Sequence, residues 1–350
     1  MLDQIASRQP VQKQWGVVPA PVSRMPQRIV ALGGGTGLSV LLQGLRMVCF
    51  PPGTGIPGRE QDRDRLTAIV TAADDGGSSG ALRQMFRILA PGDIRNCLLA
   101  LSDAEPTLQA LFNYRFDGKF GGHSLGNLML TALTLLEQDF TKAIERASEL
   151  LAVCGRVLPA TSDDVNLLAE FLDGSCAVGE SSITASRRPI HRVYLAPAGA
   201  QAVPQAITAI SASDLVVIGP GSLYTSLIPT LLVQDIARTI VQSRVPVVLV
   251  MNLMTEHGET DGYTAIDVLT AIQDHVPELQ IDSVLLNTTP IPERFAHSRA
   301  AGGIMPIIAD PDAIRSLRYR VAQCELLDES HMIRHEPRKL AQALLNLVTC

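Results

Sequence analysis

Short, almost continuously apolar runs that end in glycine or polar residues recur along this chain and alternate with segments of helical spacing. Runs of this length are typical of parallel strands that are buried on both faces. The predicted strands are 28–34, 66–72, 214–222, 245–252, 283–289 and 304–310. The predicted helices are several in 79–152, then 204–212, 230–243, 263–276 and 337–348. This alternation predicts an α/β protein with a Rossmann-like, largely parallel sheet and helices on both faces.

Three segments depart from this alternation. Residues 165–183 contain two apolar runs on either side of an Asp-Gly turn, which predicts a small β-hairpin. Residues 1–27 are polar and dotted with proline and predict a flexible N-terminal arm, while 49–65 predict a loop insert. We expect the rest of 28–350 to form one Rossmann-like domain, because hydrophobic residues make up 46% of the chain.

The composition argues against several classes of function. The net charge is −6 and no basic tract is present, which argues against nucleic acid as a partner. No apolar run approaches the roughly 18 residues of a membrane span. The N-terminus lacks the apolar stretch of a signal peptide, so we expect a cytoplasmic protein without membrane insertion. The six cysteines form no C-x-x-C pair, which suits a reducing compartment and gives no metal-cluster spacing.

The segment after the first predicted strand is rich in glycine. It consists of Gly33, Gly34, Gly35, Thr36, Gly37 and Leu38. Ligands bind beyond the carboxyl ends of parallel strands, and glycines there let the backbone approach an anion at a helix N-terminus. The segment predicts a phosphate site; the alternative is a tight turn without a ligand. It is neither a dinucleotide fingerprint nor a Walker A loop, which weakens NAD binding and ATP hydrolysis as candidates.

An aspartate pair and a second glycine segment follow the next predicted strand. The residues are Asp74, Asp75, Gly76, Gly77, Ser78 and Ser79. An acidic residue at this place commonly binds a ribose hydroxyl, and two adjacent carboxylates suit Mg²⁺ together with phosphate oxygens. The alternative is a capped helix start, because aspartate and serine are good N-caps.

The segments after two later strands have the same character. They contribute the candidate residues Gly219, Gly221, Ser222, Tyr224 and Asn252. We expect Ser222 to cap the helix that follows it. Together with the earlier segments, they predict a pocket with many backbone donors, which suits a nucleotide or a sugar phosphate.

Residues 122–126 match G-x-S-x-G, the turn that presents the nucleophile in α/β-hydrolases. Such a turn needs a buried strand before it, and the polar, glycine-rich residues that precede it predict none. We therefore predict that Ser124 caps the following helix or donates to a phosphate there. His123 either contacts the ligand or merely packs. The sequence shows no nucleophile and base arranged for catalysis.

Seven segments together resemble the YvcK family, the group known as gluconeogenesis factors, which is similar to the CofD 2-phospho-L-lactate transferases in its glycine loop and aspartate pair. The segments are VALGGGTGLSVLLQGLR, LTAIVTAADDGGSSGALR, PGDIRNCLLALSD, GGHSLGNLMLTAL, GRVLPAT, DLVVIGPGSLYTSLIP and NLMTEHGETDGYTAIDVL. They run in order from about 28 to 310. The 1–27 arm and the 49–65 insert lie outside the pattern, and Glu256-His257 replaces the family's usual Gln-Pro.

The resemblance implies a cytoplasmic, Rossmann-like protein that binds a UDP-sugar such as UDP-N-acetylglucosamine and is needed for cell shape and wall synthesis during gluconeogenic growth. No established reaction comes with the family. Its ligand segments correspond here to 33–38, 74–79, 219–224 and the residues Asp93, Arg95, Asn96, His123, Ser124 and Asn127. Arg95 would bind a diphosphate through its guanidinium fork; alternatively, Asp93 caps its helix and pairs with Arg95 on the surface.

Two functions remain open. The first is a nucleotide-sugar-binding regulator without a certain cofactor or metal, and the lack of a recognisable nucleophile favours it. The second is a Mg²⁺-dependent transferase acting on a nucleotide-diphospho donor, as in the CofD relatives, with the metal at Asp74 and Asp75. A homo-oligomer is compatible with the sequence, which identifies no protein partner.

Overall fold

The computed structural model describes residues 28–51, 63–118, 121–292, 304–328 and 333–349. At its centre is a seven-stranded sheet with the order β10-β9-β8-β7-β1-β2-β3, in which every neighbouring pair is parallel. The strands are β1 (Ile29–Gly33), β2 (Leu66–Val70), β3 (Arg156–Pro159), β7 (Leu215–Ile218), β8 (Val247–Val250), β9 (Ser283–Asn287) and β10 (Arg320–Cys324). This sheet confirms the predicted α/β, Rossmann-like class.

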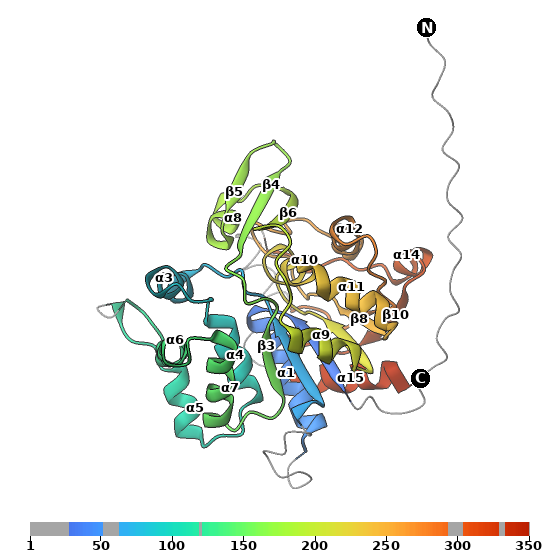
Figure 1. Ribbon diagram of the computed structural model, residues 1–350. Helices are drawn as coiled ribbons and strands as arrows, with labels where there is room; N and C mark the ends of the chain where they lie inside the picture. The colour runs from blue at the N-terminus through green and yellow to red at the C-terminus, as the bar shows by residue number, and fades with distance from the viewer. Residues whose placement is uncertain (1–27, 52–62, 119–120, 293–303, 329–332, 350) are drawn as a thin grey trace.

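The order of the strands places a crevice between β1 and β7. The chain moves from β1 to β2 in one direction across the sheet and from β7 to β8 in the other. Because parallel crossovers are right-handed, the helices of the two halves cover opposite faces. One face carries α1 (Gly35–Cys49), α4 (Gly92–Leu101) and α15 (Pro337–Thr349), and the other carries α9 (Pro204–Ser211) and α11 (Gln234–Ser243) (Figure 1). Ligands of such sheets bind where the direction reverses.

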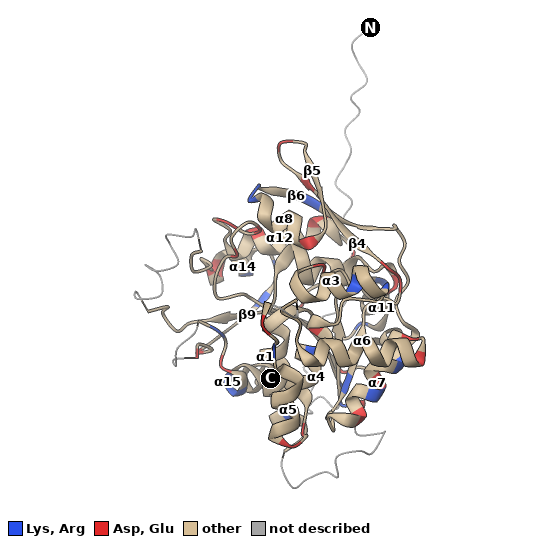
Figure 2. Ribbon diagram, turned by 90° about the vertical axis from the view of Figure 1, so that its left-hand side faces the viewer, with Lys and Arg blue, Asp and Glu red and all other residues tan. Residues whose placement is uncertain are grey.

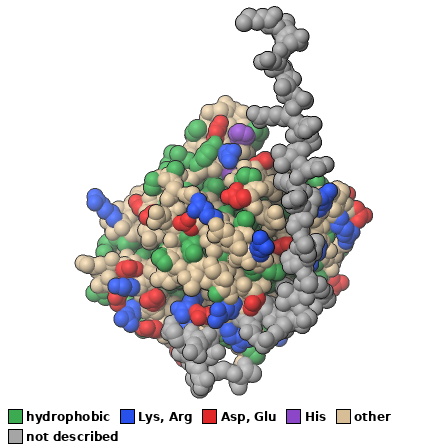
Figure 3. Space-filling model, turned by 45° about the vertical axis from the view of Figure 1, so that its right-hand side comes forward, with side chains coloured by type: hydrophobic (Ala, Val, Ile, Leu, Met, Phe, Trp, Pro, Cys, Tyr) green, Lys and Arg blue, Asp and Glu red, His purple; other side chains and the backbone are tan. Residues whose placement is uncertain are grey.

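The remaining helices lie beside and above this sheet. They are α3 (Gly77–Phe86), α5 (Pro106–Asn113), α6 (Leu125–Glu137), α7 (Phe140–Leu150), α8 (Glu180–Ser186), α10 (Ile228–Leu232), α12 (Ala265–His275) and α14 (Pro311–Ser316), with a π-helical turn η2 (Leu223–Leu227). Figure 2 shows α3, α6 and α7 stacked in this order. In the described ranges, no helix is long and apolar enough to cross a membrane. Acidic and basic side chains are interspersed over the described part of the face in Figure 3.

A small antiparallel sheet with the order β5-β4-β6 stands beyond the carboxyl end of β3 (Figure 1). Its strands are β4 (Asn166–Phe171), β5 (Cys176–Val178) and β6 (Ile190–Ala196). The predicted hairpin is confirmed as β4 and β5, which pair in antiparallel register. The chain leaves the large sheet at Thr161 and returns at Ala202, and these two residues pair in an isolated bridge. The small sheet is therefore an excursion whose two ends lie side by side.

Three predicted elements are partly wrong. The hairpin does not extend to 183, because Gly179 has a φ of +93° and α8 begins directly after it. The expected strand 304–310 forms only isolated bridges at Pro306 and Ile308 within its described residues, and a proline cannot donate to a ladder. The expected helix 230–243 is divided at Val233 into α10 and α11. The predicted arm (1–27) and the central part of the predicted insert (52–62) lie outside the described residues.

Candidate functional site

The segment between β1 and α1 is shorter than the predicted glycine loop. Only Gly34 separates the strand from the helix, Thr36 lies in the first helical turn, and Leu38 belongs to the hydrophobic core. A Cβ atom at Gly37 would lie 2.4 Å from the carbonyl oxygen of Pro220, so close packing of α1 on the segment after β7 requires this glycine. Gly35, in contrast, has a φ of +64° and open space beside it. Packing thus explains part of the glycine content, and Gly35 has room for a ligand.

The first amide of α1 is bonded to a carboxylate. Gly35 N donates to Asp93 Oδ2 over 2.7 Å. Burial, followed by the charge of Asp74, raises the pKa of Asp93 to about 6. The helix that carries Asp93, α4, begins at Gly92 without a side-chain cap. The alternative that Asp93 caps its own helix is therefore wrong, because it satisfies the N-terminus of α1 instead.

Arg95, also on α4, is almost fully buried, with an exposed fraction of 7%. Its Nη2 atom donates to Asn96 Oδ1 over 2.6 Å, whereas its Nε and Nη1 atoms have no hydrogen-bond partner among the described residues. Burial, followed by the charge of Arg115, lowers the pKa of Arg95. A surface pair with Asp93 is therefore wrong. Buried donors without a partner call for an explanation, and an anionic ligand supplies one.

The start of α6 brings together three of the predicted residues. Ser124 is fully buried, and its Oγ atom accepts a hydrogen bond from Asn127 N over 3.2 Å, which makes it the N-cap. The predicted cap is confirmed, and between α5 and α6 the described residues form no strand longer than an isolated bridge. The Nδ1 atom of His123 lies 2.8 Å from the Oγ atom of Ser78. The same Ser78 Oγ atom accepts a hydrogen bond from Asn127 Nδ2 over 3.1 Å. The histidine of the G-x-S-x-G motif, His123, therefore contacts Ser78 and not the serine of the motif.

Alanine in place of Ser124 is expected to lower the free energy of unfolding by about 1 kcal/mol, the usual cost of losing an N-cap. Urea unfolding of the two proteins measures this difference. The variant is expected to match the wild type in its action on an activated ester. If this single change abolished a robust ester hydrolysis, Ser124 would be a nucleophile and not a cap.

The aspartate pair lies between the carboxyl end of β2 and the start of α3. Asp74 Oδ1 accepts from Gly76 N over 2.8 Å, and its carboxylate also accepts from the Ser79 hydroxyl. Burial is the main cause that raises the pKa of Asp74. The N-cap of α3 is Gly76, which has no side-chain bond, so neither aspartate caps the helix in the ordinary way. Gly77 follows with open space beside it.

The small sheet places a further carboxylate over this pair. Asp75 Oδ1 accepts from Ser181 N over 2.8 Å, so the first turn of α8 is fixed above the end of β2. Burial, followed by the charges of Asp74, Asp93, Glu259 and Asp75, raises the pKa of Glu180 to about 9. Glu180 could not be predicted as a site residue, because it lies in a segment that was expected to continue a strand. The contact joins the helix between β5 and β6 to the aspartate pair.

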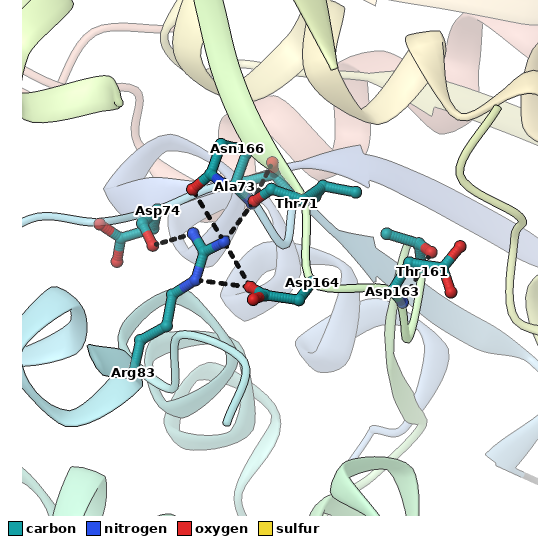
Figure 4. A network of polar contacts seen from close by, with 9 residues as sticks. Thr71, Ala73, Asp74, Arg83, Thr161, Asp163, Asp164 and Asn166 are labelled. Atoms are coloured by element: carbon teal, nitrogen blue, oxygen red, sulfur yellow. Dashed lines mark hydrogen bonds and ion pairs between the residues drawn. The ribbon is translucent and has the colours of Figure 1, made fainter. Parts of the chain in front are cut away.

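Arg83 fixes the base of the small sheet to α3. Figure 4 shows its guanidinium reaching the link between β3 and β4, where it donates to Asp164 Oδ1, Val165 O and Asn166 Oδ1. It also donates to Asp74 O over 3.5 Å. One buried arginine therefore couples the aspartate segment to the chain that enters the small sheet. The sequence did not reveal this role, because Asp164, Val165 and Asn166 lie 81 to 83 positions away.

The segments after β7 and β8 form hydrogen bonds with each other. Asn252 accepts from Gly221 N over 3.1 Å and donates to Gly221 O over 2.8 Å. Tyr224 is buried, with its hydroxyl 2.8 Å from that of Tyr263. Ser222 stands at the cap position of η2 without the side-chain bond expected of a cap, and Glu259 instead accepts from Tyr224 N. These contacts hold together the two segments that follow the carboxyl ends of β7 and β8.

The carboxylates fit a divalent cation only in part. Among the described residues, no group of three or more histidine, cysteine or acidic side chains is arranged to hold a metal ion. Mg²⁺ in nucleotide sites needs only one or two carboxylates together with phosphate oxygens, and Asp74 and Asp75 meet that requirement. If Mg²⁺ bound there, it would neutralise charge on the diphosphate and on the neighbouring carboxylates.

Comparisons with known proteins agree with the fold and the motifs. A family profile described as 2-phospho-L-lactate transferase CofD matches residues 29–327. A relative from Nostoc sp. is 46% identical over 323 residues, which cover 91% of this chain and 68% of the relative. Proteins named gluconeogenesis factor are 42% identical in Halalkalibacterium halodurans and 40% identical in Bacillus subtilis, and each alignment covers more than 90% of both chains.

A solved structure resembles the whole arrangement. The crystal structure of a Bacillus halodurans protein described as a member of the UPF0052 family has a TM-score of 0.84 and 42% sequence identity. The match covers 91% of this chain and 99% of that one. The chain therefore belongs to the CofD family, and within it to the proteins named gluconeogenesis factors.

Proposed function

We propose that this protein binds a nucleotide-sugar of the UDP-N-acetylglucosamine type in the cytoplasm and acts as a regulator of wall synthesis and cell shape during gluconeogenic growth. The observation that supports it most is Arg95, a buried guanidinium with two nitrogens that have no partner among the described residues. A diphosphate offers adjacent acceptor oxygens that match this fork. The name of the relatives, gluconeogenesis factor, supports the metabolic part of the proposal.

The proposed ligand lies in the crevice with its diphosphate toward Arg95 and the first turns of α3 and α6. Helix N-termini favour anions, and Gly77 leaves space beside the first turn of α3. The nucleoside extends along the carboxyl ends of β1 and β2, where Asp74 or Asp75 accepts from ribose hydroxyls. Gly35 and the segment from Gly219 to Tyr224 form the opposite wall.

A transferase is the second candidate, and the carboxylates favour it. Asp74, Asp93 and Glu180 lie close enough for their charges to act on one another. A diphosphate beside them is repelled unless a cation or protons neutralise part of the charge. The family profile, named for a transferase, supports this reading. In that case Asp74 and Asp75 would hold Mg²⁺ against the donor diphosphate.

Asparagine in place of Asp74 or of Asp75 separates the two candidates. For a regulator, each variant is expected to bind UDP-N-acetylglucosamine roughly ten- to a hundredfold more weakly, since a hydrogen bond to a charged group is lost. That loss is expected to be the same in Mg²⁺ and in EDTA, because the aspartate bonds ribose directly. Titration calorimetry of wild type and both variants in the two buffers measures it.

An exposed aspartate on α14, Asp312, provides the matched control, and Asp312→Asn is expected to bind as the wild type does. A wild-type affinity that collapses in EDTA, together with slow release of UDP in Mg²⁺, would replace the regulator by the transferase. If neither UDP-N-acetylglucosamine nor a guanosine diphosphate compound bound in any buffer, both candidates would be wrong.

A further inference from the structure

We propose that Ser78 and His123 form a nucleophile and general base that act on the diphosphate of the bound ligand, an inference that rests on the proposed function. Ser78 Oγ lies 2.8 Å from His123 Nδ1, although 45 positions separate the two residues. A serine hydroxyl is activated in this way when an imidazole within hydrogen-bond distance takes its proton. Both residues are only partly buried, so a ligand can reach them.

A third residue contacts the same hydroxyl and leaves its proton free. Asn127 Nδ2 donates to Ser78 Oγ over 3.1 Å, and an amide nitrogen can only donate. Ser78 therefore accepts this bond and has its own proton available for His123 Nδ1. When Ser78 donates that proton to Nδ1, His123 carries its own proton on Nε2, which is the form that a general base requires.

The pair lies beside the groups that bind the diphosphate in the proposed complex. Asn127 follows Gly126, which packs so closely on Arg95 that a Cβ atom at Gly126 would lie 2.8 Å from Arg95 Cδ. Ser78 lies in the first turn of α3, and His123 directly precedes the N-cap of α6. The hydroxyl therefore lies at the start of α3 and is bonded to the first turn of α6, which in turn packs on Arg95. Donors held in place in this manner stabilise the negative charge that develops during phosphoryl transfer.

The reaction follows from this placement. Ser78 Oγ attacks the phosphorus that carries the sugar, the Oγ–P bond forms, and the proton passes to His123 Nδ1. The bond between that phosphorus and the bridging oxygen breaks, and the nucleoside monophosphate leaves with the electron pair. Water then attacks the phosphoserine, Oγ leaves with its electron pair, and it recovers the proton from His123. One water proton remains on the released sugar phosphate, and the other passes to solvent.

The same hydrogen bonds also connect α3 to α6, and a purely structural role would affect stability alone. Chemical reactivity distinguishes the two roles, because only an activated hydroxyl reacts quickly with an electrophilic phosphorus. Glutamine in place of His123 can still accept the bond from Ser78 and is suited to keep the helices together, but it cannot act as a base at neutral pH.

The first test does not depend on nucleotide binding. The full-length protein is treated with diisopropyl fluorophosphate, and the modified residue is identified by peptide mass spectrometry. We expect labelling at Ser78 that is on the order of 100-fold slower in His123→Gln than in the wild type. The control variant Ser243→Ala, at the C-terminal end of α11, is expected to label as the wild type does. No labelling at Ser78, or equal rates in His123→Gln, overturns the proposal.

The second test uses UDP-N-acetylglucosamine and separates this inference from the proposed function. Acid-quenched wild type is expected to carry one sugar-phosphoryl group on Ser78 and to release UMP. Ser78→Ala is expected to bind the nucleotide-sugar but to release UMP on the order of 100-fold more slowly. Binding by the wild type without adduct or UMP overturns the inference and leaves the binding function intact. Labelling of Ser78 by the fluorophosphate without nucleotide binding overturns the proposed ligand and leaves the reactive serine.

Discussion

Methionine in place of Arg95 is expected to weaken binding of UDP-N-acetylglucosamine on the order of 100-fold or more, while the folded protein becomes more stable. Each hydrogen bond from a charged donor contributes roughly 1.5–3 kcal/mol, and two guanidinium nitrogens are available to the diphosphate. In the free protein those nitrogens have no partner among the described residues. Methionine fills much of the same volume without this desolvated charge, so we expect a gain of about 1–3 kcal/mol in the free energy of unfolding.

The opposite signs of these two effects make the experiment decisive. Calorimetry gives the affinity and urea unfolding gives the stability, both on the same preparations. Lysine at position 95 serves as the conservative comparison, because it keeps the charge but loses the planar fork. We expect it to bind more weakly than the wild type and more tightly than methionine. An unchanged affinity, or a large loss of stability in Arg95→Met, would make Arg95 a structural residue.

Glutamine in place of Glu180 is expected to raise the free energy of unfolding at pH 8 and to leave it unchanged near pH 4. The pKa of Glu180 rises from 4.5 to about 9 in the folded protein. Between these values the folded state binds more protons than the unfolded state, so stability falls as pH rises. Glutamine removes this dependence. We expect a gain of roughly 2–4 kcal/mol at pH 8, less than the full shift implies because the side chain is partly exposed.

Urea unfolding of wild type and variant at pH 4, 6 and 8 measures the effect. Glu145→Gln, at an exposed position on α7, is the matched control and is expected to change stability little at any pH. Asp93 and Glu259, whose pKa values rise to about 6 and about 7, act in the same direction and leave a smaller pH dependence in the variant. A loss of stability in Glu180→Gln at pH 8 would mean that the charged form of Glu180 is bonded to a partner.

The sequence predicted the central strands of the large sheet, but it did not predict the two edge strands or the third strand of the small sheet. β1, β2, β7 and β8 consist entirely of buried residues, and such runs are distinct from their surroundings. The two edge strands, β3 and β10, contain polar residues that are half-buried or exposed (Arg156, Arg320 and Gln323), so no continuous apolar run marks them. β6 alternates between buried and exposed positions, but it follows a helix that the sequence did not indicate.

The candidate site shows the same limit at the level of single residues. The Ser124 cap could be predicted because its partner is three positions away. The contacts of Ser78 with His123 and of Asp93 with Gly35 join elements that only the folded sheet brings together. Local sequence patterns carry no information about these long-range contacts. The G-x-S-x-G motif pairs His123 with Ser124 in sequence and does not predict the contact of His123 with Ser78. That these residues bind a ligand stays a prediction.

The bridge between Thr161 and Ala202 has a consequence for how this family can diversify. Because the two ends of the excursion are paired with each other, the seven-stranded sheet keeps its strand order whatever lies between them. The excursion between Thr161 and Ala202 can therefore become longer or shorter, or be replaced, while the seven-stranded sheet stays the same. Glu180 lies on α8 within this excursion, so this acidic side chain can change without any change in the order of the large sheet.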